Sequence, residues 1–380
     1  MEIERRQQTP HAPIRWRARY WGPDGKERSK TFKRKADAEK WYAAQTVDVA
    51  TGAWSDPARG RITVRVSSDR WISGSPQLKP KTITGYRSLV DNHILPSVGE
   101  VQIARLDRTA VSALIRGMTA DGRGASTIRN AVRVLSAVCG FAIDAGAIKY
   151  NPCDRVALPR SRRRDITPLT AAEVEHLADT IDPRFRTLVI FAAYTGLRAG
   201  EIGALRVGRI DLLRGRTDVV ESVAEVGGDL IAGPTKTHQS RSVALPGFPR
   251  DLLAEHIAGR ADDPEAFVFL APDGGQLRHQ NFMARFFRPA VRAAGLDGLR
   301  FHDLRHTCAA LLIAQGAHPR AIADRLGHST VSVTMDVYGH LLPSLDEALT
   351  EGLDRTWSEN RAAYSRPTGD IVDFRTTRTG

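Results

Sequence analysis

A histidine and an arginine that could act together on an anionic ligand lie one helical turn apart, His302 and Arg305 in the segment 301–306. His302 and His306 also have the spacing of the HExxH zinc motif, but Asp303 occupies the glutamate position. The permanent positive charge of Arg305 would oppose a dication. We therefore expect no metal at this site, because a cation beside a histidine suits an anionic ligand better.

One lysine stands out by its isolation. Arginine supplies 46 of the 55 basic residues, and Lys236, in the segment 233–238, is the only lysine in residues 150–380. Lysine is the cation whose pKa can be lowered enough for it to donate a proton. Lys236 is therefore a candidate proton donor, with an ordinary surface lysine as the alternative.

A second arginine follows a predicted bend. Gly196 precedes Arg198 by two residues, and residues 199–202 can begin a helix. A helix start presents free N–H groups and the positive end of the helix dipole, which favour a phosphate. Arg198, Lys236, His302 and Arg305 together form a set of cationic or proton-transferring groups that needs no metal.

Several common sites are missing from the sequence. It contains no GxxxxGK[ST] phosphate loop, no GxGxxG after a strand and no GxSxG. The three cysteines are odd in number and form no CxxC pair, which indicates neither disulfides nor a cysteine metal site. We expect no ATP, dinucleotide, metal or other cofactor.

Hydropathy argues against a membrane protein. The longest stretch without a charged residue, 306–319, has 14 residues, fewer than the 18 or more that span a bilayer. The first residues lack the apolar core of a signal peptide. We expect a cytoplasmic protein.

The excess positive charge is concentrated in the first part of the chain. The formal net charge of the 380 residues is +12, but residues 1–165 carry +15 and residues 166–338 carry −1. A basic segment of this kind suits the backbone of a polyanion, where salt-dependent affinity arises. The candidate chemistry therefore lies in a nearly neutral part of the chain.

Near the N terminus, residues 14–20 alternate in character and predict a strand with Arg15, Arg17 and Arg19 on one face. Residues 22–25 predict a turn, 26–32 a returning strand, and 36–49 a helix on the aromatic face. The basic face could enter a nucleic-acid groove, which admits a β-ribbon. The alternative is a solvated basic hairpin.

Residues 56–158 are predicted to form a helical domain, with helices at 63–73, 82–93, 109–118 and 126–145. The following linker, 159–165, contains Arg162, Arg163 and Arg164 and is either a flexible tether or a strap across a phosphate backbone. Beyond it the predicted elements mix: an apolar segment at 188–193, strands at 218–220 and 240–245, and helices at 171–180, 249–260, 281–294, 303–315 and 319–325.

Five segments resemble, in order and spacing, those of the tyrosine recombinase (phage integrase) family: residues 195–202, 235–237 with 241–245, 302–306, 326–328, and 337–338. The resemblance is strong over 165–355 and looser upstream, and the catalytic set shows no departure. It implies a multidomain α+β fold. The parts would be a β-sheet-plus-helix arm-binding module (1–55), a helical, SAM-like core-binding domain (56–158), the linker (159–165), a mainly helical catalytic domain with a small β-sheet (166–355) and a tail (356–380).

The resemblance also implies roles for six residues. Tyr338 would attack a DNA phosphodiester and give a 3′-phosphotyrosyl enzyme. Arg198, Arg305 and His328 would stabilise the charge of the transition state. His302 would accept the tyrosine proton, and Lys236 would protonate the leaving 5′-oxygen. His306 and His340 are more readily interpreted as packing or supporting groups.

The expected partners are double-stranded DNA attachment sites and three further copies of the chain in a tetramer. A host DNA-bending protein and an excision directionality factor are additional candidates. Apolar residues at helical spacing between 345 and 357 could pack on the same domain or on a neighbouring protomer. Two other functions remain as alternatives: a helix-turn-helix regulator, because residues 321–329 resemble the first helix and turn of that motif, and a type IB topoisomerase.

Overall fold

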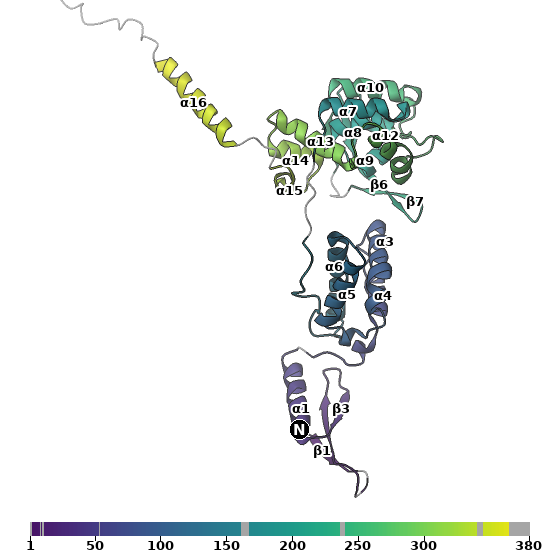
Figure 1. The fold of residues 1–380 in the computed structure, drawn as a ribbon, viewed down its shortest axis with the longest axis vertical. Coiled ribbons are helices and arrows are strands. Elements are labelled where there is room, and N and C mark those ends of the chain that lie inside the picture. The colour runs from purple at the N-terminus through teal and green to yellow at the C-terminus, as the bar shows by residue number, and fades with distance from the viewer. Residues whose placement is uncertain are drawn as a thin grey trace, which may run out of the picture. The chain divides into compact units, whose positions relative to one another are not determined.

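The computed structural model describes residues 2–7, 9, 11–52, 54–160, 167–235, 240–339 and 345–364, and for 345–349, 360 and 362–364 it describes the backbone alone. The chain divides into two compact units, Met1–Arg164 and Asp165–Gly380. Figure 1 shows the elements of each unit. None of the helices in the described ranges is long and apolar enough to cross a membrane.

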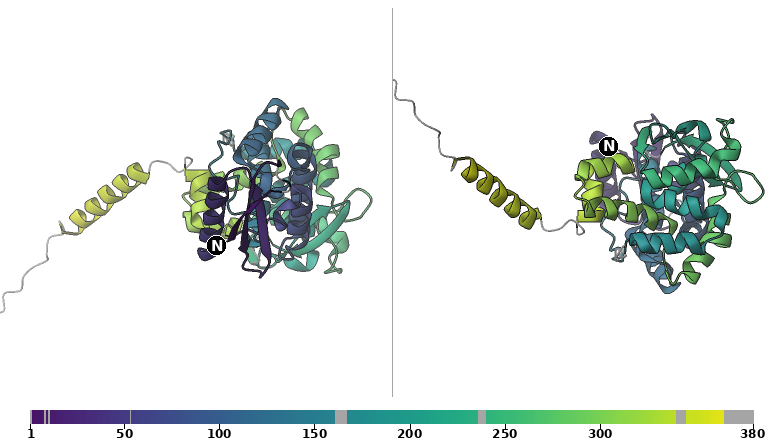
Figure 2. Two further views of the ribbon diagram at one scale, coloured as in Figure 1. Left: turned by 90° about the horizontal axis from the view of Figure 1, so that it is seen from below. Right: turned by 90° about the horizontal axis from the view of Figure 1, so that it is seen from above.

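The first unit begins with a three-stranded antiparallel sheet in the order β1-β2-β3, formed by β1 (Glu2–Arg6), β2 (Arg15–Trp21) and β3 (Glu27–Phe32). Helix α1 (Lys35–Ala50) packs against β2 and β3, as the left view of Figure 2 shows. The ring of Trp41 on α1 lies 5.4 Å from Tyr20. The predicted strands, and the helix on their aromatic face, are therefore confirmed.

The basic face of this sheet is partly neutralised by acidic neighbours. Strand β1 was not predicted, because it contains only one apolar residue. It pairs with β2 and places the carboxylate of Glu4 2.8 Å from the guanidinium group of Arg19. Glu27 on β3 lies 3.5 Å from the same guanidinium group. Arg17 donates to the Ser29 hydroxyl at 3.0 Å, whereas Arg15 is exposed. The three arginines therefore differ in how far their charge is already paired within the sheet.

The rest of the first unit is helical. Its elements are α2 (Val64–Ser73), α3 (Pro80–Leu89), a π-helical turn (Val90–Ile94), α4 (Leu95–Val98), α5 (Arg108–Ala120) and α6 (Ala125–Asp144), with short 3₁₀ turns at Arg59–Arg61 and Ile103–Arg105. Thr63 and Asp107 cap α2 and α5 through their side chains. Pro96 lacks the N–H that would continue the helical ladder, which interrupts the regular helix where the π-helical turn occurs.

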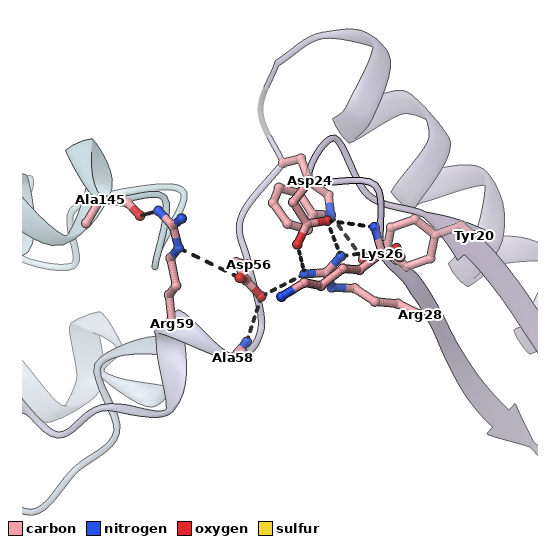
Figure 3. A network of polar contacts seen from close by, with 9 residues as sticks. Tyr20, Asp24, Lys26, Arg28, Asp56, Ala58, Arg59 and Ala145 are labelled. Carbon is pink, nitrogen blue, oxygen red and sulfur yellow. Dashed lines mark hydrogen bonds and ion pairs between the residues drawn. The ribbon is translucent and has the colours of Figure 1, made fainter.

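A polar network joins the sheet module to the helical domain within this unit (Figure 3). The guanidinium group of Arg28 binds Asp24 at 2.7 Å and Asp56 at 3.0 Å, and it lies 4.6 Å from the centre of the Trp54 ring. The Asp56 amide donates to the Gly146 carbonyl oxygen at 2.8 Å. These contacts fix the segment that connects the two modules. We call Arg28 and its three partners, Asp24, Trp54 and Asp56, the Arg28 clamp.

The second unit is built around helix α8 (Arg186–Thr195), which contacts α7 (Ala171–Thr180), α10 (Gly247–Ile257) and α13 (Phe301–Ala314). Residues 188–193 of α8 are all buried, and a helix that is apolar all round is expected at the centre of a core. The apolar segment predicted at these residues is thus the central helix. The other helices are α9 (Ala199–Ala204), α11 (His279–Phe282), α12 (Arg288–Ala293), α14 (Pro319–Leu326), α15 (Val331–Tyr338) and α16 (Leu345–Tyr364).

Two small antiparallel sheets complete the second unit. One has the order β4-β5-β8, from β4 (Ile210–Asp211), β5 (Arg216–Val219) and β8 (Arg241–Ala244). The other is a hairpin of β6 (Glu221–Val226) and β7 (Asp229–Pro234), visible in Figure 1. Its turn, Gly227-Gly228, has positive φ at both residues, as a two-residue hairpin turn requires. This hairpin was not predicted from the sequence, although the glycine pair was a usable signal.

Candidate active site

The turn between α8 and α9 positions Arg198. Gly196 ends α8 in the left-handed region, at φ 70°, and a Cβ atom there would lie 2.4 Å from the Leu326 side chain. Only glycine fits this position well, because both the conformation and the close approach exclude a side chain. Arg198 then donates from Nη2 to the carbonyl oxygen of Gly327 at 2.9 Å, which brings the turn after α14 to the site.

The buried carboxylate of Glu201 holds two arginines. It accepts from Nη1 of Arg198 at 2.9 Å and from Nη2 of Arg241 at 2.7 Å. Burial alone would raise the pKa of this carboxyl, but Arg241, and then Arg198, lower it below its usual range. Glu201 also accepts from the backbone N–H of Arg198 at 2.8 Å. One N–H group at this helix start is therefore already paired with the protein's own carboxylate.

Arg305 is the most deeply buried cation of the site, with 3% of its surface exposed. Its Nη1 donates to the carbonyl oxygen of Gly196 at 2.7 Å, which ties α13 to the turn before Arg198. Its Nη2 is buried without a hydrogen-bond partner among the described residues. Burial, and then the charge of Arg198, lower the pKa of Arg305 to about 10, so it remains charged at pH 7. An unpaired buried donor on a cation is suited to an incoming anion.

Tyr338, the last residue of α15, is buried, with 2% of its surface exposed. Its hydroxyl lies 2.7 Å from Nδ1 of His306 on α13. Burial raises the pKa of Tyr338 to about 12, an effect that the charge of Arg305 partly offsets. The structure therefore brings the predicted nucleophile to the arginine site, and the hydroxyl is neutral at pH 7.

The two other predicted histidines lie near this pair. Nδ1 of His328 lies 2.8 Å from the Thr334 hydroxyl on α15. Burial, and then Arg305 and Arg198, lower the pKa of His328 to about 4. His302 is accessible to solvent, and its ring centre lies 4.9 Å from that of His306. The loss of part of its surrounding water, and then His306 and Arg305, lower the pKa of His302 to about 4, although Asp303 acts in the opposite direction.

Other predicted residues lie outside the described ranges or in the other compact unit. Lys236 lies outside the described residues, in the sequence between β7 and β8, as do Arg162, Arg163 and Arg164 of the linker. His340 is outside them as well. The sheet arginines, Arg15, Arg17 and Arg19, belong to the other compact unit.

The sequence patterns did not reveal the roles of two residues, Glu201 and Arg241, or the contact between His306 and the tyrosine. Glu201 stands at the third position of α9, where an acidic residue is an N-terminal capping signal. Arg241 and His306 were visible in the segments 241–245 and 302–306. Their partners, however, lie at sequence separations of 40 and 32 residues, which local patterns do not reveal.

Comparison with known proteins places this geometry in a family. Residues 168–344 match the model of the phage integrase family, and residues 14–51 match the N-terminal domain of phage integrases. The chain is 30% identical to the integrase of Mycobacterium phage D29, over 83% of this chain and 85% of that protein. It is 29% identical to a putative prophage phiRv2 integrase of Mycobacterium tuberculosis, over 90% and 92% of the two chains.

Solved structures share the fold. The Tn1549 transposon integrase in complex with a circular intermediate DNA superposes with a TM-score of 0.69 and 22% identity, over 77% of this chain and 99% of that chain. A lambda integrase dimer bound to a core site gives a TM-score of 0.57 and 20% identity, over 85% and 91%. Together with the matched domains and relatives, the arrangement of Arg198, Arg305, His328 and Tyr338 leads to one conclusion. The chain belongs to the phage integrase family and is a site-specific tyrosine recombinase.

Proposed function

We propose that this recombinase integrates and excises a phage or another mobile element, with Tyr338 as its nucleophile. The tyrosine oxygen attacks the scissile phosphorus of an attachment site, and the bond to the 5′-oxygen breaks. The products are a 3′-phosphotyrosyl enzyme and a free 5′-hydroxyl. Because one phosphoester replaces another, the 5′-hydroxyl of a second strand can reverse the step without ATP.

The arginines and His328 stabilise the charge of the pentavalent transition state. The observation that carries this assignment is the buried Nη2 of Arg305, a charged donor without a partner among the described residues, in the same site as Tyr338. Arg198 is held beside it by Glu201 and Gly327. Donors fixed before the substrate arrives need no reorganisation during the reaction, which is the main source of electrostatic catalysis.

Two protons move in this step. The family resemblance gives the role of acceptor for the Tyr338 proton to His302, whose lowered pKa keeps it neutral at pH 7. The leaving 5′-oxygen needs a donor, and the resemblance gives this role to Lys236. We propose no metal or cofactor, because the arginines, histidines and lysine supply every charge and proton that the step requires.

Replacing Tyr338 tests the assignment of the nucleophile. A nicked duplex that spans the joined ends of the element traps the covalent intermediate, because the short 5′ fragment diffuses away. Tyr338→Phe should bind this duplex as the parent does and give no adduct that survives denaturant. Tyr364→Phe, which alters the nearest other tyrosine in the C-terminal sequence, should behave as the parent. An adduct formed by Tyr338→Phe would remove Tyr338 from its role.

The same assay addresses the two alternative functions. A helix-turn-helix regulator would form no adduct, and α14 and α15 are in any case part of the active site: Gly327 holds Arg198, and α15 carries Tyr338. A topoisomerase would relax any supercoiled plasmid without joint products. The family relationship favours neither alternative.

We further propose that four copies assemble on two DNA sites in the bacterial cytoplasm, at the nucleoid. Leu353 and Trp357 on α16 are 71% and 68% exposed, and such residues suit contact with a neighbouring protomer. The sheet module, with Arg15, Arg17 and Arg19, and the linker arginines 162–164 would bind DNA outside the cleavage site. A host DNA-bending protein and an excision directionality factor remain proposed partners.

A further inference from the structure

The hydrogen bond of the Tyr338 hydroxyl goes to His306, which the roles proposed above do not use. The distance of 2.7 Å from Nδ1 is that of a good hydrogen bond, and both residues are buried. The two ring centres lie 5.5 Å apart at an angle of 61°. The contact joins α13 to α15, so it is a tertiary contact rather than a local one.

The pKa shifts of this pair indicate the charge state of each group. Burial lowers the pKa of His306 and raises that of Tyr338 to about 12, so both are neutral at pH 7. A neutral phenol can donate to Nδ1 of the neutral imidazole when the ring carries its proton on Nε2, and this is the tautomer that the proposal uses. His306 is thus already in the state that a proton acceptor needs.

The charges around His306 respond to the substrate. On its own helix it faces Asp303, Arg305 and the adjoining Arg300, together with His302, while His328 approaches from the turn after α14. Asp303 favours the protonated ring, and the two arginines disfavour it. A phosphodiester bound to Arg305 would offset that positive charge and raise the basicity of His306 when the nucleophile is needed.

We propose that His306 is a catalytic residue that holds the Tyr338 hydroxyl at rest and takes its proton during attack. The proposal rests on the proposed function of Tyr338 and refines one role within it. As the tyrosine oxygen bonds to phosphorus, its O–H bond breaks and the proton passes to Nδ1 of His306. The electron pair of the breaking P–O bond stays on the 5′-oxygen, which takes its proton from another donor. His302, which is open to solvent, is left to contact the phosphate.

The variant His306→Asn distinguishes the two roles proposed for His306, which are the hydrogen bond to the Tyr338 hydroxyl and the acceptance of its proton. The Asn side chain places a carboxamide oxygen near the position of Nδ1, so it can still accept the hydrogen bond, but it cannot take the proton. Covalent complex formation on the nicked duplex should fall at least about 100-fold at pH 7 in His306→Asn and in His306→Ala. The rate of both variants should then rise about tenfold per pH unit towards pH 9, because hydroxide replaces the missing base, while the parent changes little.

The controls distinguish this role from its rivals. His256→Asn alters another partly buried histidine of the same unit, whose ring contacts the Val268 carbonyl oxygen, and should match the parent. His302→Asn should keep the parent's pH profile. A parent-like rate in His306→Asn would reduce His306 to a positioning residue, and an equal loss at every pH would make it structural. If only His302→Asn lost activity in a pH-dependent way, His302 rather than His306 would be the acceptor of the Tyr338 proton. Each of these three results overturns the proposal, whereas an adduct in Tyr338→Phe overturns the proposed function instead.

Discussion

At the scale of single residues, the described part of the candidate active site is assembled but closed. Tyr338 and Arg305 expose 2% and 3% of their surfaces, so a phosphodiester cannot reach either until part of the site moves. Meanwhile the buried carboxylate of Glu201 keeps Arg198 and Arg241 in place. Binding of DNA must therefore include the free energy of exposing the tyrosine, whereas the arginines are preorganised.

The histidines of the site make the stability of the second unit depend on pH. The folded pKa of His328 is about 4, below the unfolded value near 6.5, so the unfolded chain binds more protons between these pH values. Stability is therefore complete above about pH 6.5 and is lost as the pH falls towards 4. The melting temperature of this unit should drop by roughly 3 °C or more between pH 7 and pH 5.

Differential scanning calorimetry of the full chain at several pH values measures this effect. His328→Asn removes the titrating group and should flatten the pH dependence of the transition of the second unit. His176→Asn, on the exposed surface of α7, serves as the control and should leave the slope unchanged. Equal slopes in the parent and in His328→Asn would show that His328 does not carry the effect.

Much of the site was predictable from the sequence, but its contacts were not. The resemblance placed Arg198, His302, Arg305, His328 and Tyr338 in one domain, and the structure brings Arg198, Arg305 and Tyr338 together. Residue types and spacing do not say which of two histidines one turn apart meets the tyrosine. That choice depends on how α15 packs on α13, which is a tertiary property.

At the scale of elements, periodicity predicted the helices well and the short strands poorly. Helix α6 was expected at 126–145 and is observed at Ala125–Asp144, because long amphipathic helices give a strong repeating signal. Strand β1 and the hairpin of β6 and β7 were missed. Strand β1 has one apolar residue, and the hairpin strands are mostly half-buried or exposed, so neither shows a clear alternation.

The Arg28 clamp should stabilise the first unit more than an ordinary surface ion pair does. The side chains of Arg28 and Asp56 are 17% and 15% exposed. Asp56→Asn should therefore lower the free energy of unfolding of this unit by about 1–2 kcal/mol, because it leaves a partly buried arginine with one acidic partner fewer. Urea denaturation followed by tryptophan fluorescence measures this change, since Trp54 lies against the clamp.

An exposed ion pair in the same unit provides the matched comparison. Arg65 and Glu100 lie 2.8 Å apart, with side chains 49% and 76% exposed. Glu100→Gln should change the free energy of unfolding by less than about 0.5 kcal/mol. If Asp56→Asn and Glu100→Gln had the same small effect, the clamp would contribute no more than a surface contact.

At the scale of the whole molecule, charge and chemistry lie in different parts. Residues 1–165 carry the excess positive charge, and the second unit, nearly neutral over residues 166–338, holds the active site. Affinity for DNA and cleavage of DNA should therefore be separable by mutation. The contacts within the sheet module also show that net charge overstates the number of arginines available to DNA, because Arg19 is already paired with Glu4.

The salt dependence of DNA binding tests this difference. Arg15 is exposed, so Arg15→Gln should reduce the slope of log K against log salt by about 1, as expected when one phosphate contact is lost. Arg19→Gln should change the slope by less. Fluorescence anisotropy with a labelled duplex, over a series of KCl concentrations, gives both slopes. A larger change for Arg19→Gln than for Arg15→Gln would contradict the proposed exposure of the basic face.

The turn at Gly327 can act as a hinge for α15. Its carbonyl oxygen holds Arg198, and beyond it α15 is an eight-residue rod, about 12 Å long, that ends at Tyr338. A rotation of α15 at this point would move its Tyr338 end further than its first turn, so the tyrosine can become accessible while Arg198 stays in place. His328, bonded to Thr334 on the rod, would travel with it. The nucleophile and one of its phosphate donors would therefore arrive at the substrate in a single movement.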